Sequence, residues 1–159
     1  MRDTERAWLD ETDLGLYVLC PEAAVAEWTG EESEELYGEY AAALPVPRHG
    51  DTVVLAGLAM PVRWLAEDRV FVRSYSASDE ALPDVAELLR SGAWVDGPVV
   101  ELTAGRYLLA DVLYEGERIL ATGDYLTVEV PPGRYLVQSL NDEVDELGEF
   151  FLERLLPLR

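Results

Sequence analysis

The two stretches that decide the fold are "ELTAGRYLLADV", from Glu101 to Val112, and "EVPPGRYLVQSL", from Glu129 to Leu140. In both, a Glu is followed five residues later by an Arg, and that Arg lies within Gly-Arg-Tyr-Leu. Gly and Pro favour a turn near the centre of each stretch, and the apolar residues that follow indicate a strand. The repeat therefore predicts two similar β-hairpins rather than a pair of ligand sites.

The hairpin hypothesis specifies which charges pair. A Pro-Gly turn folds "YLTVEV" back on "RYLVQSL", and Glu129 then lies diagonally across from Arg134. The identical spacing around the Ala-Gly turn of the first copy predicts a second ion pair, between Glu101 and Arg106. Exposed pairs of this kind contribute about 1 kcal/mol or less, so the repeat indicates architecture.

Apolar and alternating segments predict further strands. Residues 14–20, "LGLYVLC", indicate a buried strand, and residues 51–65 and 69–77 indicate two more around a connection that carries Trp64. In the tail from Asn141, a short acidic turn and then a final strand are expected. Strands with short turns favour an antiparallel meander.

Three short helices are also expected. Pro21 suits a first helical position, and this helix should end just after Trp28. "EESEELYGEYAAAL", residues 31–44, predicts a strongly acidic second helix that Pro45 ends. The clearest helix covers residues 83–91, because its apolar residues recur at i, i+3, i+4 and i+7 and a Gly follows.

Together these patterns predict an α+β, predominantly β fold, with antiparallel sheets of about six to eight strands and two or three short helices packed on one side. A chain of 159 residues is expected to form one domain, with residues 1–13 as a loosely ordered N-terminal segment. The sequence contains neither a long apolar segment nor a secretory signal, so we expect a cytoplasmic protein. Cys20, the only cysteine, is expected to be a small buried hydrophobe.

Charge is the most unusual property of the sequence. The formal net charge is −20, and the first 40 residues contain twelve acidic side chains against Arg2 and Arg6. Such a surface repels nucleic acid and anionic lipid and attracts a basic partner. A surface that only keeps the protein soluble is the alternative interpretation.

Motifs for catalysis are not found. One His and one Cys cannot supply a metal site of several such ligands, and no nucleophile or phosphate-binding motif surrounds His49. The acidic run from Asn141 resembles a calcium loop in composition only, because Glu146 occupies the position that requires Gly. The sequence therefore predicts no enzyme, no cofactor and no metal site.

The order of "EWTG", "VVLAGLAMPVRWL", "FVRSYSASDEAL", "YLLADVLYEG" and "VEVPPGRYLV", with a closing "LERLLPL", resembles the immunity protein 21 family of bacterial polymorphic toxin systems. The resemblance extends over about residues 14–158. It implies a small, mainly β, cytoplasmic protein that protects its producer by binding and blocking a cognate toxin. It carries no catalytic residues with it.

Charge suggests how such a protein would bind. If the toxin has a basic active-site cleft, as a nuclease does, clustered carboxylates can occupy it in place of phosphates. Trp28 is a further aromatic anchor candidate for the interface. The candidate toxin-binding residues are Glu31, Glu32, Glu34, Glu35, Tyr37, Tyr40, Asp142, Glu143, Asp145, Glu146 and Glu149.

Two other classes of function remain open from the sequence, and the oligomeric state is not indicated. A general nucleic-acid mimic would bind many basic proteins through carboxylates spaced like phosphates. A small carbohydrate-binding or hydrolase domain would instead place Trp64, Trp94 or Tyr107 in a pocket with paired carboxylates.

Overall fold

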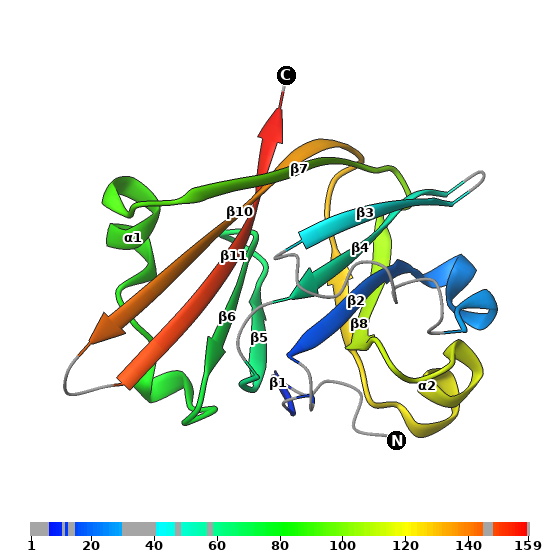
Figure 1. The fold of residues 1–159 in the computed structure, drawn as a ribbon, viewed down its shortest axis with the longest axis horizontal. Coiled ribbons are helices and arrows are strands. Elements are labelled where there is room, and N and C mark those ends of the chain that lie inside the picture. The colour runs from blue at the N-terminus through cyan, green and yellow to red at the C-terminus, as the bar shows by residue number, and fades with distance from the viewer. Residues whose placement is uncertain are drawn as a thin grey trace.

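The computed structural model describes residues 7–10, 12, 15–29, 41–46, 49–56, 59–144 and 148–158. Figure 1 shows the order of its elements along the chain. The strands are β1 (Trp8–Leu9), β2 (Leu16–Pro21), β3 (Ala41–Val46), β4 (Gly50–Ala56), β5 (Val62–Leu65), β6 (Val70–Ser74), β7 (Val95–Leu102), β8 (Arg106–Asp111), β9 (Leu126–Glu129), β10 (Gly133–Val144) and β11 (Gly148–Leu158). The helices are the 3-10 helices η1 (Glu22–Glu27) and η3 (Asp79–Ala81) and the α-helices α1 (Val85–Ser91) and α2 (Gly116–Thr122).

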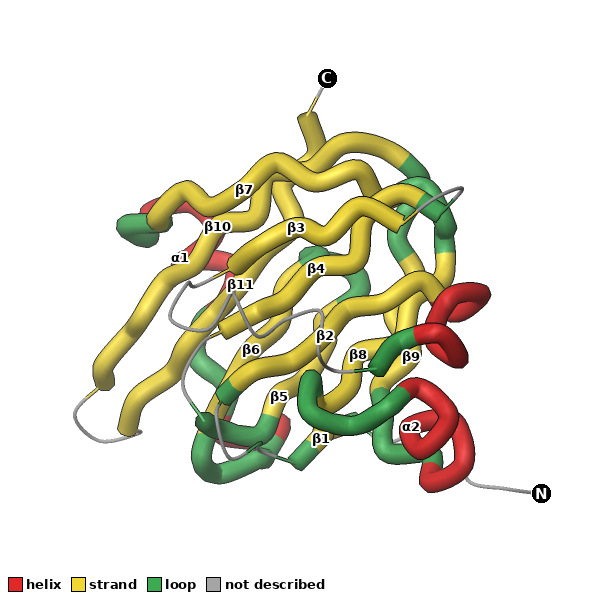
Figure 2. Tube along the Cα trace, turned by 45° about the vertical axis from the view of Figure 1, so that its right-hand side comes forward, coloured by secondary structure: helices red, strands yellow, loops and turns green. Residues whose placement is uncertain are grey.

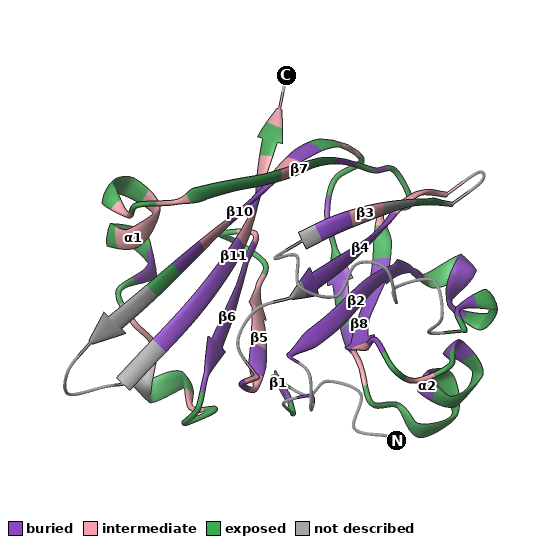
Figure 3. Cartoon of the chain, viewed as in Figure 1, coloured by how far each residue is buried: buried purple, intermediate pink, exposed green. Residues whose placement is uncertain are grey.

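The strands form two antiparallel sheets that pack face to face. Their strand orders are β1-β5-β6-β11-β10-β7 and β3-β4-β2-β8-β9. The core between the sheets contains buried side chains from both, among them Tyr17, Leu55, Phe71, Tyr107 and Leu155. Figure 3 shows this burial along the central strands, whereas the edge strand β7 is mostly exposed. The predicted class, predominantly β with a few helices, is confirmed, although eleven strands are described where six to eight were expected.

The helices lie on both outer faces of the sandwich and not on one side as predicted. On the sheet that contains β2 and β8, η1 and α2 cover a cluster built around Val18, Val25 and Ile119. On the other sheet, α1 covers a cluster that includes Val72 and Phe150. Figure 2 shows α1 at one side of the molecule and η1 with α2 at the other. Both sheets are therefore apolar on two faces, which explains strands such as β2 in which every residue is buried.

The repeated stretches are not hairpins. β7 belongs to the first sheet and β8 to the second, and the chain returns from the second sheet to the first between β9 and β10. Each Gly-Arg-Tyr-Leu therefore follows a corner at which the chain changes sheets. Tyr107 and Tyr135 are buried at equivalent places beyond the corners. The Tyr107 hydroxyl accepts a hydrogen bond from Ala104 N, and the Tyr135 hydroxyl donates one to Pro131 O.

The two copies pair with each other and form one bent ribbon. β7 pairs with β10 and β8 pairs with β9 in the same register, and a bond from Val130 N to Gly105 O continues the ladder through the bend. Arg106 consequently pairs with Glu129 at 2.9 Å, and Arg134 lies 3.8 Å from Glu101. The predicted pairs within each copy, Glu129 with Arg134 and Glu101 with Arg106, are wrong, because the partner strand comes from the other copy.

This exchange of partners gives a direct test of the fold. We expect a double-mutant cycle between Arg106→Gln and Glu129→Gln to give a favourable coupling below about 1 kcal/mol in urea unfolding, since both side chains are half-exposed. The same cycle between Arg106→Gln and Glu101→Gln serves as the control and should give none. A larger coupling to Glu101 than to Glu129 would contradict the ribbon.

Several local predictions are confirmed. Residues 16–21 form a buried strand, α1 lies within the predicted helix at 83–91, and β11 is the expected final strand. The side chain of Asp84 caps α1 by accepting a hydrogen bond from Glu87 N. The first expected helix is present as η1, with the tight 3-10 geometry that short helices often adopt.

Other local predictions are wrong. The last four residues of the predicted second helix, 41–44, belong to β3, and Pro45 lies inside this strand. Proline is tolerated there because β3 is the edge of its sheet, where a backbone N–H is not always needed. Trp64 lies in β5 rather than in a connection. Two residues of the expected loose N-terminal segment form β1, which pairs with β5.

The connection from β8 to β9 contains the helix α2, where only turns were expected. Glu115-Gly116 and Thr122-Gly123-Asp124, residue types that are typical of turns, are the two ends of this helix. Gly123 ends it with a positive φ of 76°, the left-handed conformation that glycine adopts at low cost. A helix of seven residues is too short to be stable alone, so its packing on η1 stabilises it.

Candidate functional site

The predicted toxin-binding residues fall into two groups. Glu31, Glu32, Glu34, Glu35, Tyr37 and Tyr40 lie outside the described residues, as do Asp145 and Glu146. The backbone of Asp142 and Glu143 belongs to β10 and that of Glu149 to β11. The second group therefore belongs to one hairpin, and the structure shows where the described part of that hairpin lies.

The β10–β11 hairpin extends beyond its neighbours. β7 pairs with β10 only as far as Ser139, and β6 pairs with β11 only from Phe150 onward. The pairing of β10 with β11 continues past both points to Val144 opposite Gly148. Figure 1 shows this end of the hairpin projecting past α1. We call residues 142–149 the acidic tip, because five of its eight residues are Asp or Glu and none is basic.

Within the acidic tip, the register places two like charges opposite each other. Glu143 and Glu149 are direct partners across the strands. The tip is rich in acidic residues, which suits it to attracting cations.

Trp28, and the three aromatic residues considered for a carbohydrate pocket, have structural roles. Trp28 is only 6% exposed, and its indole N–H donates to Val112 O at 3.2 Å across the outer face of the second sheet. Trp64 packs on Phe71 with ring centroids 4.5 Å apart, and Tyr107 is fully buried between the sheets. Trp94 packs on the opposite outer face, beneath Arg154. Trp64 and Tyr107 belong to the core between the sheets, whereas Trp94 lies on an outer face, so the three do not line one carbohydrate pocket.

A buried ion pair lies in the core between the two sheets. Arg73 of β6 is 0% exposed and Glu153 of β11 is 2% exposed. Two hydrogen bonds join them, from Arg73 Nε at 2.8 Å and from Nη2 at 3.1 Å to the two carboxylate oxygens. Arg73 also donates to Gly15 O at 2.7 Å and to Leu55 O at 3.1 Å. The pair therefore joins the two sheets through charge-assisted hydrogen bonds.

The surroundings of this pair are aromatic and dry. The Arg73 guanidinium lies 4.9 Å from the Tyr17 ring centroid and 5.6 Å from that of Phe151. Burial raises the pKa of Glu153, and the charge and hydrogen bonds of Arg73 oppose that rise. A bidentate pair held from both sheets fixes their relative position more strictly than apolar contacts do. We interpret it as a structural element that orients the sheets.

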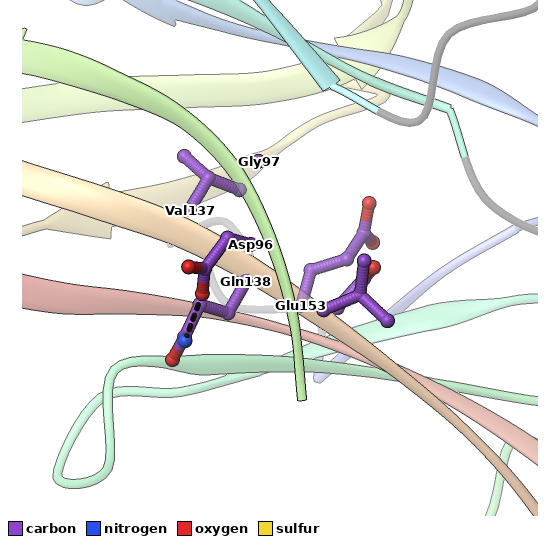
Figure 4. Close-up of a pocket in the computed structure, with 7 residues that line it drawn as sticks. Asp96, Gly97, Val137, Gln138 and Glu153 are labelled. Atoms are coloured by element: carbon purple, nitrogen blue, oxygen red, sulfur yellow. Dashed lines mark hydrogen bonds between the residues drawn. The ribbon is translucent and has the colours of Figure 1, made fainter. Parts of the chain in front are cut away.

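Glu153 borders a small pocket formed by residues of β7, β10 and β11. The pocket holds about 30 Å³, the space of a single water molecule, and its other walls include Gly97 and Val137. Figure 4 shows Glu153 on one side of it and the hydrogen bond from Gln138 to Asp96 on the other. Arg154 donates to Gln138 as well, and burial lowers the pKa of Arg154. This pocket is too small for an organic substrate.

The other chemically reactive side chains do not come together. Cys20 is buried as expected, with Thr52 Oγ1 3.7 Å from its sulfur, and His49 lies in the turn before β4. Among the described residues, no three His, Cys, Asp or Glu side chains are placed to hold a metal ion. No helix in this part of the chain is long and apolar enough to cross a membrane.

Sequence reasoning missed the burial of Arg73 and Glu153. A signal for it was present, because "RVFVRS" and "FFLERLL" are strands with apolar residues on both faces and a charge in the middle. A charge in such a strand requires an opposite charge nearby. The two segments are 80 residues apart, so only the pairing of β6 with β11 shows that they meet.

Comparison with known proteins assigns no family to this architecture. No protein-family model matches the chain, and neither curated proteins nor solved structures give a match.

Proposed function

We propose that this chain is a bacterial immunity protein, an antitoxin that acts in the cytoplasm by binding and neutralising a cognate polymorphic toxin. The observation that carries the proposal is the acidic tip, a projecting hairpin end with five carboxylates and no cation. The resemblance of the sequence to the immunity protein 21 family supports it. The chain acts by binding and carries out no catalysis of its own.

The charge distribution favours a basic protein as the partner. At −20 the chain repels phosphates and anionic lipids, so nucleic acid and membrane surfaces are poor partners. A basic cleft, such as the active site of a nuclease, would receive the acidic tip in place of phosphate groups. Residues 31–40, with Tyr37 and Tyr40, are the second candidate part of the interface.

The test is a titration against the toxin domain encoded beside this chain, with toxicity followed in coexpression. We expect a single stoichiometric complex whose association slows as salt rises, because exposed charges steer the encounter. Glu143→Lys with Glu146→Lys should slow association about tenfold or more at low salt. Reversal of Glu31, Glu32, Glu34 and Glu35 tests the second part of the interface in the same way.

Glu67→Lys with Asp68→Lys is the matched control, since both residues are exposed in the turn between β5 and β6, away from the tip. This pair changes net charge by the same amount and should alter association much less. Equal effects of the two pairs would show that net charge alone matters and would contradict the tip. Capture of many basic proteins with similar strength would favour a general nucleic-acid mimic and overturn the proposal.

A further inference from the structure

A second acidic feature lies near α2, away from the acidic tip. A pocket of about 260 Å³ opens between the β1–β2 connection and the segment that surrounds α2. This volume is below the roughly 300–1,000 Å³ of pockets for drug-sized ligands, so it suits one side-chain-sized group. The lining is mostly polar and consists of Leu9, Asp10, Thr12, Tyr17, Asp111, Tyr114 and Asp124.

Three acidic residues from separate elements line this pocket. Asp10 follows β1, Asp111 ends β8, and Asp124 comes directly after α2. Asp111 Oδ1 accepts a hydrogen bond from Leu113 N, which fixes one of these groups. The concentration of negative charge in a concave site favours a cationic ligand.

Thr12 provides an observation independent of charge. Its side chain lines the pocket, the residue is only 4% exposed, and its Oγ1 has no hydrogen-bond partner in the structure. A buried hydroxyl without a partner carries an uncompensated desolvation cost, which a bound donor group removes. The neighbouring Tyr17 hydroxyl is held at 2.8 Å from Asp10 O and 3.1 Å from Met60 O.

The chemistry of the walls favours a guanidinium over other cations. The acidic groups here do not form a cluster that could hold a metal ion. The Asp10 carboxylate and the Thr12 hydroxyl provide acceptors for the planar fork of N–H donors that a guanidinium carries. Both aromatic walls already accept a guanidinium of the chain itself, since Arg118 lies 4.2 Å from the Tyr114 ring centroid and Arg73 4.9 Å from that of Tyr17.

We propose that the pocket formed by Asp10, Thr12, Tyr17, Asp111, Tyr114 and Asp124 binds a guanidinium group, carried by an arginine side chain or by a free small molecule. Binding of an arginine side chain rests on the proposed function, since the toxin would supply that arginine. Binding of a free guanidinium compound does not. The site lies at α2 and is separate from the acidic tip, so it can be tested without any partner.

The test is an amide-shift titration of the isotope-labelled full chain with N-acetyl-arginine amide at low salt. We expect saturable shifts at the backbone of Tyr114 and Asp124. N-acetyl-citrulline amide, which has the same shape without the charge, should produce none. Asp10→Asn and Thr12→Val should each weaken binding about threefold to tenfold, because each removes an acceptor for a charged donor. Asp68→Asn, the same change at an exposed turn outside the pocket, should leave it unchanged.

Absence of saturable shifts, equal shifts with the citrulline compound, or equal weakening by Asp68→Asn would each overturn the site. If Thr12→Val does not fold, as checked by circular dichroism, titration of Asp10→Asn with the arginine probe still tests the site. Once the arginine probe binds, the same variants are titrated with the captured toxin. Weakened toxin binding identifies an arginine of the toxin as the occupant, and unchanged toxin binding identifies a free guanidinium ligand. Failure to capture any toxin bears on the proposed function and leaves the probe result intact.

Discussion

Arg73→Met is expected to lower the free energy of unfolding by about 3–5 kcal/mol at pH 8, measured by urea denaturation. The variant keeps most of the buried volume and removes the only cation within hydrogen-bond distance of Glu153 in the described structure. It also removes the donors to Gly15 O and Leu55 O, which lie in the opposite sheet and its approach. The loss therefore combines an uncompensated buried carboxylate with two lost charge-assisted hydrogen bonds to carbonyl groups.

The cost of this substitution should depend on pH. Burial already raises the pKa of Glu153, and Arg73 opposes that rise, so its removal raises the pKa further. A group whose folded-state pKa is raised contributes stability that is present below its ordinary pKa and lost as pH rises through the folded value. The difference between Arg73→Met and the parent protein should therefore be largest at pH 8 and smaller near pH 4.5, where the lost hydrogen bonds to Gly15 O and Leu55 O still contribute.

Adding Glu153→Leu to Arg73→Met is the control for this explanation. Replacement of a whole buried pair by apolar residues is often neutral, whereas removal of one member is not. We expect the double variant to be more stable than the single one at pH 8, with the gap closing as pH falls. A single variant as stable as the parent, or a double variant less stable than the single, would contradict the structural role of the pair.

Gly116→Ala is expected to destabilise the protein by about 2–4 kcal/mol, although Ala is the better helix former. A Cβ on Gly116 would lie 1.5 Å from Val25 O and 2.5 Å from Val25 C, both backbone atoms of η1. The substitution must push α2 away from η1 and weaken the 2.7 Å hydrogen bond from Gly116 N to Trp28 O. Thermal and urea unfolding measure the loss.

Gly133→Ala is the matched control. The nearest atom to its added Cβ is Tyr135 Cε1 at 3.9 Å, an ordinary contact, and its φ is not positive. We expect a change within about 1 kcal/mol. If Gly116→Ala were as stable as the parent protein, the close packing of α2 on η1 would be wrong.

Local sequence patterns predicted much of the secondary structure but not its connections. The buried strand at residues 16–21, the helix α1 and the final strand β11 follow from apolar spacing and end signals that lie within a few residues. Residues 41–44 show the limit, since an Ala-rich segment after an acidic run favours a helix. Pairing with β4 places it in a sheet instead, and propensity is overridden by tertiary contacts.

The candidate sites show the same division. Net charge, and the acidic composition of residues 142–149, could be taken from the sequence directly. The extension of this hairpin beyond β6 and β7 could not, because it depends on where those two neighbouring strands stop pairing. The pocket proposed to bind a guanidinium has no local signal in the sequence, since Asp10, Asp111 and Asp124 come from distant parts of the chain.

The sequence by itself determined the buried strand at residues 16–21, the helix α1 and the final strand β11, because those patterns depend on neighbours along the chain. It also determined that the two copies of Gly-Arg-Tyr-Leu are architecturally equivalent. Only the tertiary structure decided that the copies pair with each other across two sheets and that Arg73 meets Glu153 between them. The physical reason is that a turn within one sheet and a corner between two sheets use the same residue types. Which of the two forms depends on the distant strands with which the chain pairs and against which it packs.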